Sequence, residues 1–216
     1  GIEFLALVAR DTPTALGVDV IVVGGGNTAM DCARSAVRLG ARNVTVLYRR
    51  TRRDMPCLME EVEAAEAEGV EIDYLVSPVR LERRGNDRLL LTCQRMELGE
   101  PDASGRRRPV PVCGSEFAID GSTVIAAIGQ AVERSLAERE GLQVSARGIA
   151  ADARTLATNL HGVFAGGDAV LGADLAVRAV AAGRMAAASI DQFVRGDIVT
   201  GEPATWGITM RPIDDG

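Results

Sequence analysis

The sequence predicts an α/β fold in which a parallel sheet is followed by an antiparallel meander and then by a second α/β segment. An unbroken β-branched run, VDVIVV at 18–23, is typical of a parallel strand that is buried on both faces. Strand-like and helix-like segments then alternate as far as residue 77, which is the order of a parallel sheet with right-handed crossovers. Beyond residue 78 short strand-like runs follow one another without helices, which indicates an antiparallel meander.

The first half of the chain supplies the parallel sheet. Residues 1–17 predict a short helix and a linker, and the strand over 18–23 follows. A helix comes next, because apolar residues recur at helical spacing up to the C-capping Gly40. We then expect a strand over 43–48, a helix from Pro56 to Gly69 and a third strand over 71–77.

The second half supplies the meander and the last segment. Short strands are predicted over 79–81, 89–93, 110–112 and 116–119, separated by a turn at Gly85–Asn86 and a polar loop over 99–109. A buried strand is expected over 122–128, followed by an irregular polar stretch over 131–160. A strand over 163–165 and a long helix from about Ala173 to about Phe193 complete the pattern.

The composition excludes several classes of function. The 216 residues are 47% hydrophobic and 25% charged, which is ordinary for one or two soluble domains. A net charge of −6 argues against a nucleic-acid or anionic-membrane partner, and no apolar run reaches the length of about 18 that a membrane span requires. All 24 basic residues are arginines, so a Schiff-base lysine and a P-loop lysine are excluded.

The cysteines and the one histidine do not form a metal site. Cys32, Cys57, Cys93 and Cys113 are far apart in the sequence, and their spacing fits neither a zinc site nor an iron–sulfur cluster. We interpret them as small apolar residues in a reducing cytoplasm. His161 is interpreted as a loop residue without a catalytic role.

The strongest motif is a glycine turn between the first strand and the first long helix. Gly24 permits a tight turn, Gly26 leaves space for a pyrophosphate, and Ala29 lets the helix pack close to the strand. The helix N-terminus then offers N–H groups to the phosphates. The motif predicts a dinucleotide site, and the alternative is a glycine turn that binds no ligand.

The end of the second strand predicts which dinucleotide is bound. An NAD site has an acidic residue there, whereas this chain has Tyr48, Arg49 and Arg50, then Arg52 and Arg53. Guanidinium groups bind a 2′-phosphate with paired hydrogen bonds, so we predict NADP(H), with Tyr48 or an arginine stacked on the adenine. The alternatives are a solvated basic face or a nucleic-acid patch. We interpret the second cluster, at 106–108, as solvated, with a partner surface as the alternative.

A second nucleotide signature lies near the C-terminus, in TNLHGVFAGGDAV at 158–170. A short strand would deliver Asp168 to its carboxyl end, where a carboxylate suits the hydroxyls of a second nucleotide, and Gly167 would clear the backbone beside it. The positive end of the following helix would stabilise a reduced flavin.

Five segments together carry a resemblance to a known family: GGGNTAMD, VTVLYRRTRRDMP, RMELGEPDASGRRRPVP, VIAAIGQ and TNLHGVFAGGD. The chain resembles the small (beta) subunit of NADPH-dependent glutamate synthase and its relatives, within the flavin- and pyridine-nucleotide-dependent oxidoreductases. The resemblance covers residues 1 to about 196. It corresponds to the C-terminal half of the family only, because the family's earlier glycine fingerprint and cysteine-rich segments have no counterpart here.

The resemblance implies a role for each matching residue. Gly24, Gly25, Gly26, Asn27 and Thr28, with Ala29 behind them, match the loop that holds the NADPH phosphates. Arg49 and Arg50 match the residues that bind the 2′-phosphate, with Arg52 as a further candidate. Gly129 and Gln130 match the crossover to the flavin domain, Gly167 and Asp168 the pair that contacts FAD, and Ala173, Asp174 and Leu175 the helix start beneath the flavin ring.

The implied organisation is a Rossmann-like NADPH-binding domain, with its parallel sheet and antiparallel meander, plus the C-terminal portion of an FAD-binding domain. We place a linker with a short helix at 1–14, the NADPH-binding domain at 15–130, the FAD-domain portion at 131–199 and a tail at 200–216.

The expected function is electron input from NADPH through FAD, and on through iron–sulfur clusters of the missing N-terminal half to a large catalytic subunit or another acceptor. The alternatives are the NADPH module of a related reductase, similar to dihydropyrimidine dehydrogenase or to ferredoxin:NADP oxidoreductase, and a non-catalytic NADPH-binding module. The isolated fragment is expected to be inactive.

Overall fold

The computed structural model describes residues 1–12, 14–85, 88–101 and 106–202. It divides into two compact units, one over residues 1–129 and one from residue 130 onward. The part of the predicted tail after residue 202, part of the predicted loop over 99–109 and Asn86 of the predicted turn lie outside the described residues.

The first unit is built on a four-stranded parallel sheet in the order β3-β2-β1-β7. Its elements are α1 (Ile2–Ala9), β1 (Asp19–Val23), α2 (Asn27–Arg38), β2 (Asn43–Tyr48), a 3-10 turn (Arg52–Asp54), α3 (Met59–Ala67), β3 (Glu71–Tyr74) and β7 (Thr123–Ala126). The predicted α/β class with a parallel and an antiparallel sheet is therefore confirmed.

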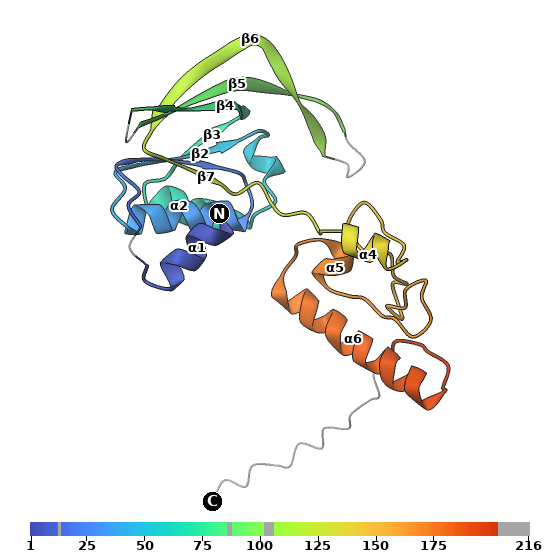
Figure 1. Ribbon diagram of the computed structural model, residues 1–216. Coiled ribbons are helices and arrows are strands. Elements are labelled where there is room, and N and C mark those ends of the chain that lie inside the picture. The colour runs from blue at the N-terminus through green and yellow to red at the C-terminus, as the bar shows by residue number, and fades with distance from the viewer. Residues whose placement is uncertain (13, 86–87, 102–105, 203–216) are drawn as a thin grey trace, which may run out of the picture. The chain divides into compact units, whose positions relative to one another are not determined.

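A three-stranded antiparallel sheet covers one face of the parallel sheet, and α1 and α2 lie on the other face (Figure 1). Its strands are β4 (Val76–Arg84), β5 (Arg88–Pro101) and β6 (Arg107–Gly121). Successive side chains of β1 face opposite sides of the sheet, so both layers are needed to bury them. Val20 and Val22 belong to the core on the helical side, while Ile21 packs with Leu91 and Cys93 on the other side. A strand buried on both faces is the arrangement that its unbroken apolar run predicted.

Two predicted strand boundaries are wrong. The strand predicted over 71–77 is two strands, because Leu75 between them has a φ of 57° and turns the chain out of the parallel sheet into the antiparallel one. The two strands predicted over 110–112 and 116–119 are one long strand, in which a bulge lies between Pro111 and Glu116. The ends of the predicted polar loop over 99–109 also belong to β5 and β6, and their polar sequence resembled a loop because the outer face of this sheet is exposed.

Two predicted helix starts are also displaced. The helix expected from Pro56 begins at Met59, because the backbone N–H of Leu58 is bound by the side-chain oxygen of Asn27, 3.1 Å away. The long helix expected from about Ala173 begins at Ala176, as α6 (Ala176–Arg195), and a separate short helix, α5 (Asp168–Leu171), precedes it. Gly172, with a φ of 79°, ends α5, so residues 173–175 are not helical.

The second unit contains α4 (Ser135–Arg139), α5 and α6 joined by loops. The strand predicted over 163–165 is reduced to one bridge between Ala157 and Phe164. Several apolar side chains of α6 are exposed, among them Val177, Val180 and Val194. Within the described ranges, no helix is long and apolar enough to cross a membrane.

Candidate functional site

A cleft of about 570 Å³ opens at the carboxyl ends of β1, β2 and β7. This is the edge at which open parallel sheets bind ligands, and the volume lies in the usual range for cofactor sites. Its wall comprises the glycine turn, the end of β2, the start of β4 and the residues after β7, with these members: Val23–Gly26, Thr28, Leu47–Arg50, Pro56, Val76–Pro78, Arg106 and Ala127–Gly129.

The three glycines of the turn are required for different reasons. Gly24 has a φ of 145°, and a Cβ there would lie 2.2 Å from the carbonyl oxygen of Ala127. A Cβ on Gly25 would lie 2.4 Å from the ring of Tyr48. Gly26 differs from both, because its Cβ would meet no described atom within 4 Å beyond its own chain neighbours, although the residue lines the cleft. The space beside Gly26 is therefore open to a ligand.

The helix α2 begins directly at this turn. Gly26 is its N-cap, and no side chain caps the helix. Ala29 is fully buried, which allows α2 to pack closely on the sheet. Thr28 lines the cleft, whereas the Asn27 side chain is bound to the backbone of Leu58 and lies outside the lining. The start of a twelve-residue helix thus presents backbone N–H groups and its positive end to the cleft.

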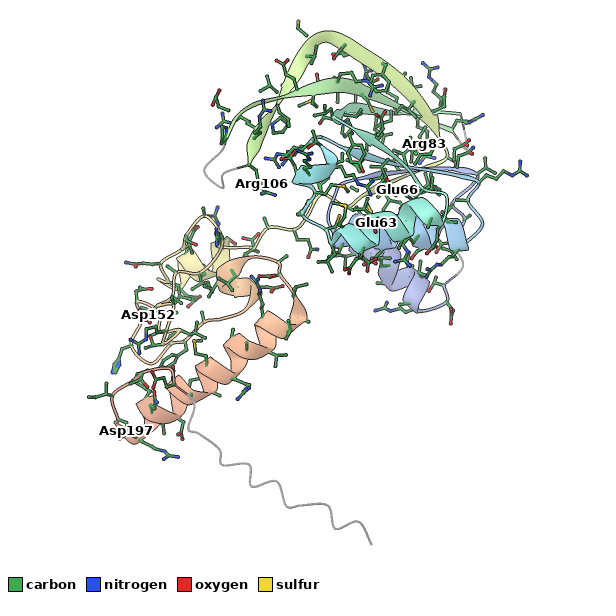
Figure 2. All side chains as sticks on the ribbon, turned by 180° about the vertical axis from the view of Figure 1, so that it is seen from behind. Glu63, Glu66, Arg83, Arg106, Asp152 and Asp197 are labelled. Carbon is green, nitrogen blue, oxygen red and sulfur yellow. The ribbon has the colours of Figure 1, made fainter. Side chains whose placement is uncertain are left out.

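The residues at the end of β2 lie in three different environments. Arg49 is exposed at the cleft, while Arg50 also lines it but is only 5% exposed. Arg52 forms an ion pair with Glu66 on α3 and does not line the cleft (Figure 2 labels Glu66). Arg49 and Arg50 therefore line the cleft, whereas Arg52 is held by its ion pair with α3.

Tyr48 forms part of the cleft wall. Its ring packs on Gly25, its hydroxyl donates to the carbonyl oxygen of Asp54 at 2.7 Å, and the residue is 6% exposed. Burial raises the pKa of Tyr48, and a hydrogen bond with Arg50 and the charges of Arg50 and Arg106 oppose that rise. Little of the ring is left for stacking on an adenine.

Several lining residues were not assigned to this site from the sequence. Arg106 precedes β6 and reaches the same cleft as Arg49, although its cluster was interpreted as solvated. Ser77 and Pro78 come from the start of β4, and Ile128 follows β7 and is exposed. The position of Ile128 just after a strand of the sheet was a usable signal, whereas nothing local placed Arg106 in the cleft.

The candidate flavin residues belong to the second unit, whereas Gly129 of the predicted crossover lines the first cleft. Gln130 lines a smaller cavity of about 270 Å³ together with Leu171 and Gly172. Gly167 has a φ of 62°, and Asp168 is exposed as the first residue of α5.

The three residues expected at the start of the last helix precede it. Asp174 accepts a hydrogen bond from the backbone of Leu175 at 2.7 Å, which lowers the pKa of its carboxyl group. Ala173, Asp174 and Leu175 are all exposed. Among the residues that the structure describes, no group of His, Cys, Asp and Glu side chains could hold a metal ion.

A parallel sheet with a glycine turn at the mouth of such a cleft defines the class of the Rossmann-like α/β proteins. The chain belongs to the pyridine nucleotide-disulphide oxidoreductase family, whose pattern matches residues 5–183. The thioredoxin reductase of Lactococcus lactis has the same fold, with a TM-score of 0.67 at 18% identity over 88% of this chain and 57% of that one.

Two relatives show how similar the sequence is to curated proteins. The chain is 52% identical to the NADP(+)-dependent formate dehydrogenase subunit beta of Moorella thermoacetica, over 90% of this chain and 28% of the relative. It is 42% identical to the glutamate synthase [NADPH] small chain of Escherichia coli strain K12, over 84% of this chain and 40% of the relative. The chain thus spans well under half the length of either relative, and the resemblance to glutamate synthase small subunits is confirmed.

Proposed function

We propose that this chain is the NADPH-binding part of an electron-input subunit that transfers hydride from NADPH to FAD. The observation that carries the proposal is the charge of the cleft. Three arginines and no acidic residue stand among its described lining residues, and two of the arginines follow the strand at which an NAD enzyme has a carboxylate. A 2′-phosphate is favoured at such a site, and a bare 2′-hydroxyl gains nothing from it.

The residues present fit a dinucleotide. The open space beside Gly26 and the start of α2 suit a pyrophosphate, since the backbone N–H groups and the helix dipole favour anions there. The exposed guanidinium of Arg49 suits the 2′-phosphate. We assign no catalytic side chain, because hydride transfer needs no acid from the protein.

The second unit fits only part of a flavin site. Gly167 and Asp168 leave an exposed carboxylate beside a left-handed glycine, which suits the hydroxyls of a ribityl chain. The only glycine fingerprint of the sequence is the one assigned to NADPH, so the ADP half of FAD has no phosphate loop here. FAD, when bound, would supply the acceptor for the hydride, and iron–sulfur clusters in another part of the protein would take the electrons from it.

The final acceptor is a separate question from the function of this segment. One relative is named as a formate dehydrogenase subunit and another as a glutamate synthase small chain, and this chain is similar to both. We therefore infer that the segment receives electrons from NADPH, and that a partner subunit, of the glutamate synthase type or of another, determines the acceptor.

Calorimetric titration of the chain with NADPH and with NADH tests the proposal. We expect NADPH to be preferred by about 2–3 kcal/mol, which corresponds to about 30- to 150-fold. The Arg49→Gln variant should lose much of this preference without a change in its NADH affinity. Equal affinities of the unmutated chain for the two nucleotides would refute the proposal.

A further inference from the structure

Arg106, which precedes β6, and the first two residues of β6, Arg107 and Arg108, have three different environments. Arg106 lines the cleft (Figure 2 labels it where β6 begins). The Arg107 side chain binds the backbone of β5, with its Nε donating to the carbonyl oxygen of Gly99 at 3.1 Å. Arg108 is exposed and is not part of the cleft lining. The cluster is therefore not a uniform solvated face.

Arg50 connects the end of β2 to the start of β6, in the hairpin that β5 and β6 form. Its Nε donates to the carbonyl oxygen of Arg107 at 2.8 Å, and its own carbonyl oxygen accepts from the backbone N–H of Leu75 at 3.2 Å. The residue is 5% exposed, so this connection is shielded from water. A buried guanidinium thus fixes the backbone that lies directly beside Arg106.

Positive charge is concentrated in the cleft beside the start of β6. Arg106 and Arg49 both line the cleft and are both exposed, but they come from different layers of the unit. The effect of Arg106 on the pKa of Tyr48 shows that its positive charge acts on this wall of the cleft. If the guanidinium groups of Arg49 and Arg106 could both move freely, a bound anion would have no fixed position. Because the hairpin of β5 and β6 is fixed, the positions open to the guanidinium of Arg106 are limited.

We propose that Arg106 determines nucleotide specificity by contacting the 2′-phosphate of NADPH from the hairpin, with Arg50 as the positioning residue. This inference rests on the proposed function. One guanidinium forms a paired contact with two oxygens of a phosphate monoester, so a second guanidinium on another element can bind a further oxygen of the same group. Specificity then depends on the antiparallel sheet as well as on the strand that carries the motif.

Binding of two small nucleotides distinguishes the contact of Arg106 with the 2′-phosphate from the other contacts of the site. 2′,5′-ADP carries the 2′-phosphate, 5′-AMP lacks it, and neither requires a flavin. We expect calorimetry on the full chain to show that Arg106→Gln weakens 2′,5′-ADP binding about tenfold or more and leaves 5′-AMP binding within about twofold. Arg106→Lys should restore part of the loss, because it keeps the charge but not the planar fork.

Arg108→Gln is the matched control, since it removes the same charge two residues away without touching the cleft. It should leave the ratio of the two affinities unchanged, and thermal unfolding should show that every variant is folded.

Each other outcome has a definite meaning. If the unmutated chain binds 2′,5′-ADP no better than 5′-AMP, the proposed function itself fails. If the unmutated chain discriminates and Arg106→Gln discriminates equally well, only the role of Arg106 is overturned. An equal loss for both nucleotides also overturns it, because a residue that merely supports the fold would weaken both.

Discussion

Replacing Gly26 by valine should abolish NADPH binding while leaving the fold intact. Gly26 has φ −90° and ψ 176°, an extended conformation that a β-branched residue adopts readily. Apart from its neighbours in the chain, no atom of the described residues lies within 4 Å of the position its Cβ would occupy. The added side chain would therefore fill only the space that we assign to the pyrophosphate.

The expected change in folding free energy is small because two effects oppose each other. Valine has less backbone freedom than glycine, so it lowers the conformational entropy of the unfolded chain. This effect stabilises the fold by about 0.4–1 kcal/mol. Loss of the preferred N-cap glycine of α2 costs about 0.5–1 kcal/mol. The net change should stay within about 1 kcal/mol. Binding should fall by more than about 100-fold, since two or more charge-assisted hydrogen bonds to the pyrophosphate are lost together.

Neighbouring glycines provide the controls. Gly25→Ala would place its Cβ 2.4 Å from the Tyr48 ring, so a buried side chain must move, at a cost of about 1–3 kcal/mol. Gly24→Ala would meet the carbonyl oxygen of Ala127 at 2.2 Å in a left-handed backbone, and should destabilise the fold further. Thermal unfolding followed by circular dichroism, beside NADPH titration of each variant, measures both quantities. A folded Gly26→Val variant that binds NADPH normally would show that the dinucleotide is not held at this turn.

Three further results are expected. The purified chain should be colourless, without FAD, and should not reduce dyes with NADPH; a stoichiometric flavin absorbance would contradict this. A thiol reagent at about pH 8 should modify Cys113 fastest, since it is exposed, whereas Cys57 is buried and burial raises the pKa values of Cys32 and Cys93 to about 11. Equal rates for all four thiols in the folded chain would count against the structure. Arg38 and Arg34 lower the pKa of Glu68 from 4.5 to about 2, so Glu68→Gln should lower the melting temperature at neutral pH. That difference should disappear as the pH falls from 4.5 towards 2, and a difference independent of pH would rule out the ion pair as its source.

The sequence was sufficient wherever a local pattern has one physical solution. The run at β1 could only be a strand buried on both faces, and the glycine turn after it could only open at the carboxyl end of the sheet. The fold class and the family therefore followed from short segments. The environment of Arg49 also followed, because it lies one residue beyond a strand end.

The features that the sequence did not predict depend on contacts between residues that are far apart in the chain. Arg106 reaches the cleft because the hairpin is fixed to the buried Arg50, and the two residues are 56 positions apart in the sequence. The start of α3 depends on a hydrogen bond from Leu58 to Asn27, and the end of β3 depends on the left-handed Leu75. Propensity and periodicity describe neighbours along the chain, so they contain no information on such pairs.

The pairing of β1 with β7 has a consequence for the order in which the molecule folds. Val20 lies beside Thr123, so this contact closes a loop of about one hundred residues, whereas β1, β2 and β3 are joined through short crossovers. Closing so long a loop costs entropy that only the completed hairpins and the packed sheet can offset, which makes β7 the strand we expect to add last. Ala127–Gly129 follow β7 and form one wall of the cleft. A partly folded chain can therefore contain the glycine turn and the arginines of β2 and still lack a binding site, so ligand affinity reports on the final step of folding.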